Sequence, residues 1–147
     1  MTSPSTDRRY GINSGVAFKA PCKVTTTANI TLSGEQTIDG VLTTADRVLV
    51  KDQTDATANG IYLSDTGDWT REPDFDGNRD VVTGTSVFVF DGSTNDNTYW
   101  SVTTADPIVI DTSSIAFELA IVNSATTSSF IQSGTGSITR TAQDKMR

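Results

Sequence analysis

The stretch from residue 37 to residue 64 constrains the fold more than any other part of this chain, because it combines two turn signals with two strand signals. The pairs Asp39-Gly40 and Asn59-Gly60 tolerate the positive φ angles of tight turns. Between them lies the β-branched run Arg47-Val-Leu-Val-Lys51, and Ile61-Tyr-Leu-Ser64 begins another strand. We predict a hairpin of residues 47–51 and 60–64, with residues 52–59 as its loop.

The rest of the chain repeats this alternation of short strands and polar turns. A second hairpin is predicted from residues 85–91 and 97–103, around the polar turn 92–96. Shorter strands are expected at 22–25, 30–32, 108–110 and 115–121, whereas residues 72–84 are expected to form a long polar connection. The twenty-five threonines also favour strands over helices. The predicted fold class is all-β, as a small antiparallel sandwich or barrel-like module.

Two of the predicted strands carry the apolar residues expected to form the core or contacts between subunits. In residues 85–91, apolar side chains alternate over both faces, which indicates a central strand or one covered by a second sheet or subunit. In residues 115–121, apolar side chains recur at every second position along one face. The candidate core and subunit-contact residues are Val87, Phe88, Val89, Phe90, Ile115, Phe117, Leu119 and Ile121, together with Phe130 and Ile131 further along.

The composition divides the chain into three parts. Residues 1–20 are polar and charged with scattered apolar positions, which predicts an extended N-terminal arm that packs on something else; Arg8, Arg9, Tyr10 and Phe18 are its candidate contacts with a partner. Residues 21–122 form the predicted β module. Residues 123–147 begin with a Ser/Thr/Gly linker and end in the start of a helical neck, which suggests that a further body follows.

Charge and residue types exclude several classes of function. Residues 24–137 carry 16 acidic and 4 basic side chains, a net charge of −12, whereas the two ends carry 7 basic and 2 acidic ones, a net charge of +5. An acidic body of this kind does not favour binding to nucleic acid.

No apolar run is long enough to span a membrane, and the start of the chain lacks the hydrophobic core of a signal peptide. The chain has no histidine, which removes His-dependent nucleophiles and imidazole metal ligands, and its one cysteine, Cys22, is predicted to be a small, partly buried strand residue.

Three arrangements that could carry chemistry were weighed against solvated turns and core packing. The carboxylates at 65, 68, 72, 74 and 76 would be the candidates for a glycosidase-type acid pair, but they lie in turn-like contexts. The segment Asp74–Asp80 spaces its oxygen atoms as calcium loops do, yet it lacks the glycine and glutamate of the EF-hand pattern. The aromatic residues Tyr10, Tyr62, Trp69, Tyr99 and Trp100 could form a sugar-stacking platform, although adjacent residues such as Tyr99 and Trp100 face opposite sides of a strand. We therefore expect no catalytic residue, no metal and no cofactor in this chain.

Several short sequence motifs occur in the same order as in a known protein family. They are Thr27-Ala-Asn-Ile-Thr-Leu-Ser-Gly-Glu-Gln-Thr-Ile-Asp-Gly-Val41, Asp46-Arg-Val-Leu-Val-Lys-Asp-Gln-Thr-Asp55, Asn59-Gly-Ile-Tyr62 and Trp69-Thr-Arg71. Over residues 20–122 the chain resembles the N-terminal virion-anchoring, or head-binding, module of bacteriophage tailspikes and tail fibres. It departs from that pattern at Thr43-Thr-Ala45, where a more glycine-like turn is expected.

The resemblance implies a structural virion component with no enzymatic activity of its own. It implies a homotrimer that joins a receptor-binding or polysaccharide-degrading spike to a tail or baseplate protein or to another tailspike, and a location in the phage tail. The terminal segment Arg140-Thr-Ala-Gln-Asp-Lys-Met-Arg147 is similar to the neck that precedes the body of such spikes. The alternatives left open are a carbohydrate-binding module that contacts host glycans through Trp69 or Trp100, and a hydrolase.

Overall fold

The computed structural model describes residues 6–7 and 12–121, and the side chains of residues 16–120. These residues form mostly β-sheet, in which most strand pairs are antiparallel, so the all-β prediction is confirmed. The helical elements are single turns, α1 (Ser14–Ala17), η1 (Ala56–Ala58) and η2 (Pro73–Phe75). The strands are β1 (Thr6–Asp7), β2 (Ile12–Asn13), β3 (Val24–Thr25), β4 (Thr37–Ile38), β5 (Val41–Leu42), β6 (Arg47–Val50), β7 (Gly60–Leu63), β8 (Thr70–Arg71), β9 (Ser86–Val89), β10 (Thr98–Val102) and β11 (Phe117–Ile121).

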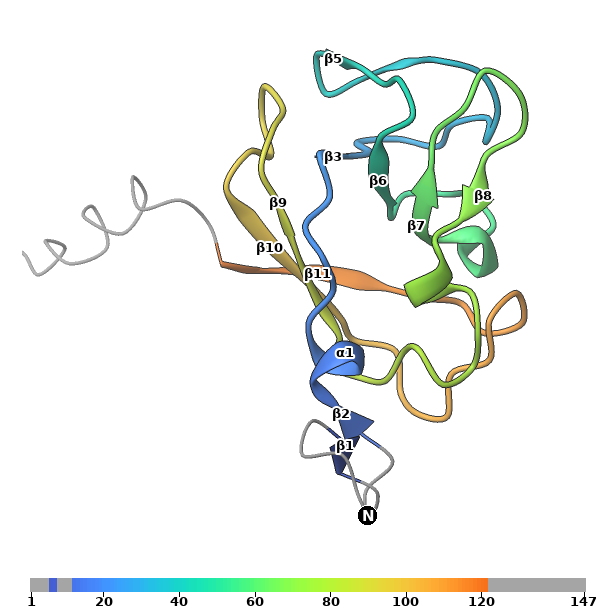
Figure 1. Ribbon diagram of the computed structural model, residues 1–147, viewed down its shortest axis with the longest axis vertical. Helices are drawn as coiled ribbons and strands as arrows, with labels where there is room; N and C mark the ends of the chain where they lie inside the picture. Colours follow the sequence, from blue (N-terminus) through green and yellow to red (C-terminus); the bar gives the residue numbers. More distant parts are fainter. Residues whose placement is uncertain (1–5, 8–11, 122–147) are drawn as a thin grey trace, which may run out of the picture.

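Two larger sheets organise the molecule, in the orders β3-β6-β7-β8 and β11-β10-β9 (Figure 1). Both predicted hairpins are confirmed, since β6 pairs with β7 and β9 pairs with β10, each antiparallel. Each of these strands has at least one buried face. The side chains therefore alternate between the two faces as the sequence pattern predicts.

The segment from residue 18 to residue 25 joins the two sheets. Cys22 forms a parallel bridge with Val89 of β9, and its N–H donates to the carbonyl of Phe88. Two residues later β3 pairs in parallel with β6, an exception to the predicted antiparallel arrangement. Figure 1 shows β3 between β9 and β6. The pairing starts at Phe18, so the last residues of the predicted arm lie against β9.

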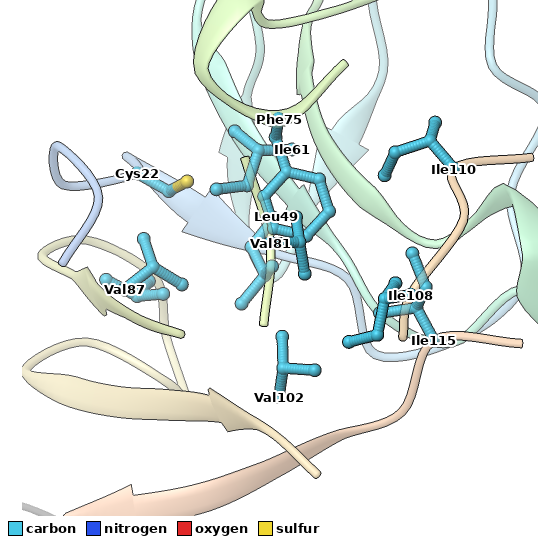
Figure 2. Close-up of a cluster of buried hydrophobic side chains, with 11 residues drawn as sticks. Cys22, Leu49, Ile61, Phe75, Val81, Val87, Val102, Ile108, Ile110 and Ile115 are labelled. Carbon is cyan, nitrogen blue, oxygen red and sulfur yellow. The ribbon is translucent and has the colours of Figure 1, made fainter. Parts of the chain in front are cut away.

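The larger hydrophobic core draws on both sheets (Figure 2). Phe75 lies at its centre with no exposed surface, and Leu49 of β6 and Ile61 of β7 pack with it. We call this cluster the main core; its residues are Cys22, Leu49, Ile61, Phe75, Val81, Val87, Val89, Val102, Ile108, Ile110 and Ile115.

A second core lies on the other face of β6 and β7. Its buried members are Val24, Ile38, Val48, Val50, Tyr62 and Trp69. Strands β6 and β7 therefore both bury side chains on their two faces, and Val48, Leu49 and Val50 of β6 are all fully buried. Strand β9, for which two covered faces were predicted, buries Val87 and Val89, but Phe90 directly after it is 52% exposed.

Residues 39–45 contain two turns whose backbone needs positive φ. Asp39 (φ 48°) and Gly40 (φ 83°) form the tight turn predicted between β4 and β5. The Asp39 carboxylate accepts hydrogen bonds from the backbone N–H groups of Thr94 and Asn95, which fixes this turn against the β9–β10 loop. Ala45 also has a positive φ of 50°, so the turn before Asp46 takes a glycine-like conformation without a glycine.

Five sequence-based expectations are wrong in detail, each because a local hydrogen bond or burial replaces the predicted element. Residues 30–32 form no strand, because the Gln53 side-chain amide forms hydrogen bonds with both the N–H and the carbonyl of Ile30. Residues 108–110 form no strand; Val109 accepts hydrogen bonds from the N–H groups of Thr112 and Ser113, which closes a local turn. Residues 72–84 are not merely a polar connection, because they supply Phe75 and Val81 to the main core.

The other two expectations concern Asn59 and the last strand. Asn59 is extended and Gly60 already belongs to β7, so this pair forms no tight turn; the buried Asn59 amide instead donates to the carbonyl of Ile115. That bond, together with one from the Ile115 N–H to the Ala56 carbonyl, ties Ile115 to η1, and β11 therefore starts only at Phe117.

Candidate functional site

The outer face of the β11-β10-β9 sheet carries a group of aromatic side chains. Along β9, Val87 and Val89 point into the main core, so Phe88 and Phe90 lie on the opposite side. Tyr99 of β10 pairs with Phe88, and their rings lie 4.9 Å apart between centroids at an interplanar angle of 50°. A tilted pair of this kind is a favourable aromatic contact.

Phe18 adds a fourth aromatic ring to the same face. It forms a parallel bridge with Ser86, whose position two residues before Phe88 places it on the outer side of β9. The N–H of Lys19 donates to the Ser86 carbonyl at 2.9 Å and holds this segment in place. Phe18 is 69% exposed. We call Phe18, Phe88, Phe90 and Tyr99 the aromatic face.

The aromatic face is uncharged, although it belongs to an acidic body. Between the rings lie Ser86 and Ser101, whose hydroxyls are 2.8 Å apart, and Glu118, paired with Ser101, borders the face. Elsewhere, basic side chains are held in ion pairs with carboxylates, at Lys23–Asp46, Arg47–Asp74, Arg47–Glu72, Lys51–Asp52 and Arg71–Asp111. These pairs neutralise much of the positive charge of the body.

The structure distributes the predicted contact residues over three environments. Phe18, Phe88 and Phe90 come together on the aromatic face, whereas Val87, Val89 and Ile115 belong to the main core. Phe117 packs at the border of that core, and Leu119 is 43% exposed. Arg8, Arg9, Tyr10, Phe130 and Ile131, and the side chain of Ile121, lie outside the described part of the chain. Sequence reasoning did not assign Tyr99 to this face, although its strand register opposite Phe88 is the signal that places it there.

Among the aromatic residues weighed as a sugar platform, Tyr10 lies outside the described residues, and Tyr62, Trp69 and Trp100 do not share a surface. Trp69 is only 6% exposed, and its indole N–H donates to the Gly34 carbonyl. Tyr62 is equally buried, and its hydroxyl donates to the Ala58 carbonyl. Trp100 packs against the main core with the Lys51 ammonium 4.3 Å from its ring centroid. These three side chains offer no common ring surface to a glycan.

Three of the carboxylates weighed as catalytic or calcium-binding groups, Glu72, Asp74 and Asp80, have structural partners. Asp74 accepts two hydrogen bonds from the Arg47 guanidinium, at 2.9 and 2.6 Å, and Glu72 forms a second ion pair with it. Asp80 accepts hydrogen bonds from the backbone N–H groups of Asp76 and Gly77. Among the described residues, no group of three His, Cys, Asp or Glu side chains could hold a metal ion.

Cys22 is fully buried in the main core. Burial raises the pKa of its thiol from 9.0 to about 12. We therefore expect iodoacetamide at pH 8.5 to modify Cys22 slowly in the folded protein and rapidly in denaturant, because the thiolate is the nucleophile. Equal rates in the two states would contradict this assignment.

The same shift predicts a dependence of stability on pH. The stabilising contribution of the protonated thiol is complete below pH 9, where Cys22 is protonated in both states. It is lost as the pH rises from 9 to about 12, because the unfolded thiol then ionises first. Denaturant titrations of the wild type and Cys22→Ala over this range should show a larger loss of stability in the wild type, since the raised pKa of Tyr62 acts in both proteins.

Comparisons with models of protein families, with characterised proteins and with solved structures find no match to this chain. In the part of the chain that the structure describes, no helix is long and apolar enough to cross a membrane.

Proposed function

We propose that this chain is a structural attachment module of a bacteriophage tailspike or tail fibre, which forms a homotrimer and joins the spike to a tail or baseplate protein or to another spike. The sequence motifs that occur in the same order as in such modules suggest this role. The observation that carries it in the structure is the aromatic face, an exposed apolar surface of the kind that marks protein–protein contacts.

The charge distribution favours a second copy of the chain as the occupant of the aromatic face. Two copies of a body with many acidic side chains repel one another over most of their surfaces. The aromatic face is a surface on which they can meet with few opposing carboxylates, because serines separate its rings and Glu118 lies only at its border. Burial of Phe18 and Phe90 on contact would also remove large exposed apolar areas from water.

Substitution of the two most exposed rings tests this contact. We expect the double variant Phe18→Ser with Phe90→Ser to weaken self-association at least tenfold in sedimentation equilibrium, since each ring contributes on the order of 1.5–3 kcal/mol when it is fully buried. The control is Leu42→Ser, which removes a side chain of 58% exposure on β5. An unchanged association constant in the double variant would contradict the role of this face.

Attachment itself is tested by removing residues 1–13. The cut spares Val16 and the segment that pairs with β9, so we expect the stability of the body to be retained. Spikes that carry the truncated chain should assemble but fail to enter virions during infection, as measured by immunoblotting of purified particles. Incorporation at the level of the full chain would rule out attachment through the N-terminal arm.

A further inference from the structure

The two larger sheets end in strands with very different edges. Strand β8 has only two residues, and its edge is protected from pairing with another strand. The Arg71 guanidinium is held by Asp111, and Pro73 lies two residues after the end of the strand. Strand β11 has five residues and pairs only with β10 in the described part of the chain. Residues 115–121 contain no lysine, arginine or proline, which are the usual protection of an exposed edge.

The hydrogen-bond pattern shows which backbone groups of β11 face outward. The N–H of Thr103 donates to the carbonyl of Ala116 at 2.9 Å. Because donors and acceptors alternate between the two sides of an antiparallel strand, the N–H and C=O groups of Phe117 and Leu119 point away from β10. These groups can therefore accept one further strand.

The side chains along this edge describe the strand that would fit. On the inner side, an apolar row runs from Val87, 1% exposed, through the partly buried Trp100 to Leu119, 43% exposed, and stops at the edge. On the outer side, Glu118 is exposed and forms no ion pair with a described residue. An added strand would extend the apolar row opposite Leu119 and would gain from a basic residue opposite Glu118.

The geometry of β11 disfavours a second copy of the same strand as the occupant. Antiparallel pairing of two β11 strands centred on Glu118 would set two carboxylates opposite each other. Pairing centred on Leu119 would set Glu118 opposite Ala120, which is the extra residue where the register with β10 shifts. Pairing centred on Phe117 would set Leu119 opposite Ile115, whose N–H and carbonyl are already bonded to Ala56 and Asn59. The regular part of the edge, residues 116–119, therefore suits a strand of different sequence.

We propose that the edge of β11 binds an extended segment of a partner protein by antiparallel strand addition, with a basic residue opposite Glu118 flanked by apolar residues opposite Phe117 and Leu119. Phe117 and Leu119 would form the hydrogen-bonded pairs. Glu118 would form the intervening non-hydrogen-bonded pair, in which opposing side chains approach most closely. This proposal does not depend on the proposed attachment function or on a trimer.

The test is an NMR titration of the isotope-labelled chain with the peptide Thr-Thr-Val-Lys-Val-Thr-Thr. We expect the largest amide shifts at Phe117 and Leu119, because their N–H groups gain partners. A second peptide with glutamate in place of lysine should bind two- to fivefold more weakly, and E118K should reverse that order. Equal affinities for the two peptides on both proteins, or no shifts at these amides, would overturn the proposal.

A backbone variant provides an independent check. Leu119→Pro removes an outward N–H group, which an edge strand tolerates, and should abolish peptide binding while the circular dichroism spectrum is retained. Glu118→Pro is the matched control, since it removes an N–H group that faces β10 and should disrupt the sheet. Shifts at Phe117 and Leu119 that depend on protein concentration without peptide would instead show self-pairing and would overturn the assignment to a partner strand.

Discussion

Replacement of Phe75 by alanine is expected to lower the free energy of unfolding by about 3–5 kcal/mol, the range for removal of a buried aromatic ring. Phe75 is fully buried at the centre of the main core and stacks on Phe117, with ring centroids 6.0 Å apart. It packs with residues from both sheets, so the cavity would weaken the contact between them. Chemical denaturation followed by tryptophan fluorescence measures the change.

The control for this prediction is Phe90→Ala. Phe90 is 52% exposed on the aromatic face, so its removal should change the stability of the isolated chain by less than about 1 kcal/mol. If Phe75→Ala and Phe90→Ala lowered the free energy of unfolding by the same amount, the main core would not be organised around Phe75. Both variants should be compared at protein concentrations low enough to prevent self-association.

Replacement of Gly60 by alanine is the second large effect that we expect. A Cβ atom at Gly60 would collide with the Arg71 guanidinium and would lie 3.1 and 3.2 Å from two atoms of the Phe75 ring. The backbone also has a φ of 155°, which side chains rarely adopt. Strain and overpacking together should cost about 2–5 kcal/mol.

Arg71 cannot move aside without further loss. Its guanidinium donates hydrogen bonds to the carbonyls of Thr57 and Asn59 and to the carboxylate of Asp111. The matched control is Gly67→Ala, whose Cβ would meet only the Asp65 carboxylate at 3.9 Å, and which should change stability by no more than about 0.5 kcal/mol. Denaturation midpoints of the two variants that coincide would show that Gly60 is not confined by Arg71 and Phe75.

The local elements could be predicted from the sequence because their signals are local. The alternation in residues 47–51 and 85–91 and the Asp39-Gly40 turn each depend on near neighbours, and the structure confirms them. The joining of the sheets through residues 18–25 could not be predicted in this way. It depends on parallel pairing between segments more than twenty residues apart, which leaves no periodic signal in the chain.

The candidate site was predicted in parts but not as one surface. Phe18 was assigned to a tail contact, and Phe88 and Phe90 to the core or a subunit contact. The bridge between Phe18 and Ser86 and the pairing of Phe88 with Tyr99 bring these rings onto one face. The prediction of polar residues at 72–84 missed Phe75 for a related reason, since one aromatic residue among carboxylates shows no periodicity.

The mass of the purified chain in solution, measured by light scattering over a dilution series, tests the central claim most directly. We expect a species of three times 15.7 kDa. On dilution, the variant lacking the Phe18 and Phe90 rings should dissociate at a higher protein concentration than the wild type. A folded species of 15.7 kDa at every concentration, unaffected by these substitutions, would contradict the assignment of the aromatic face as the contact between subunits.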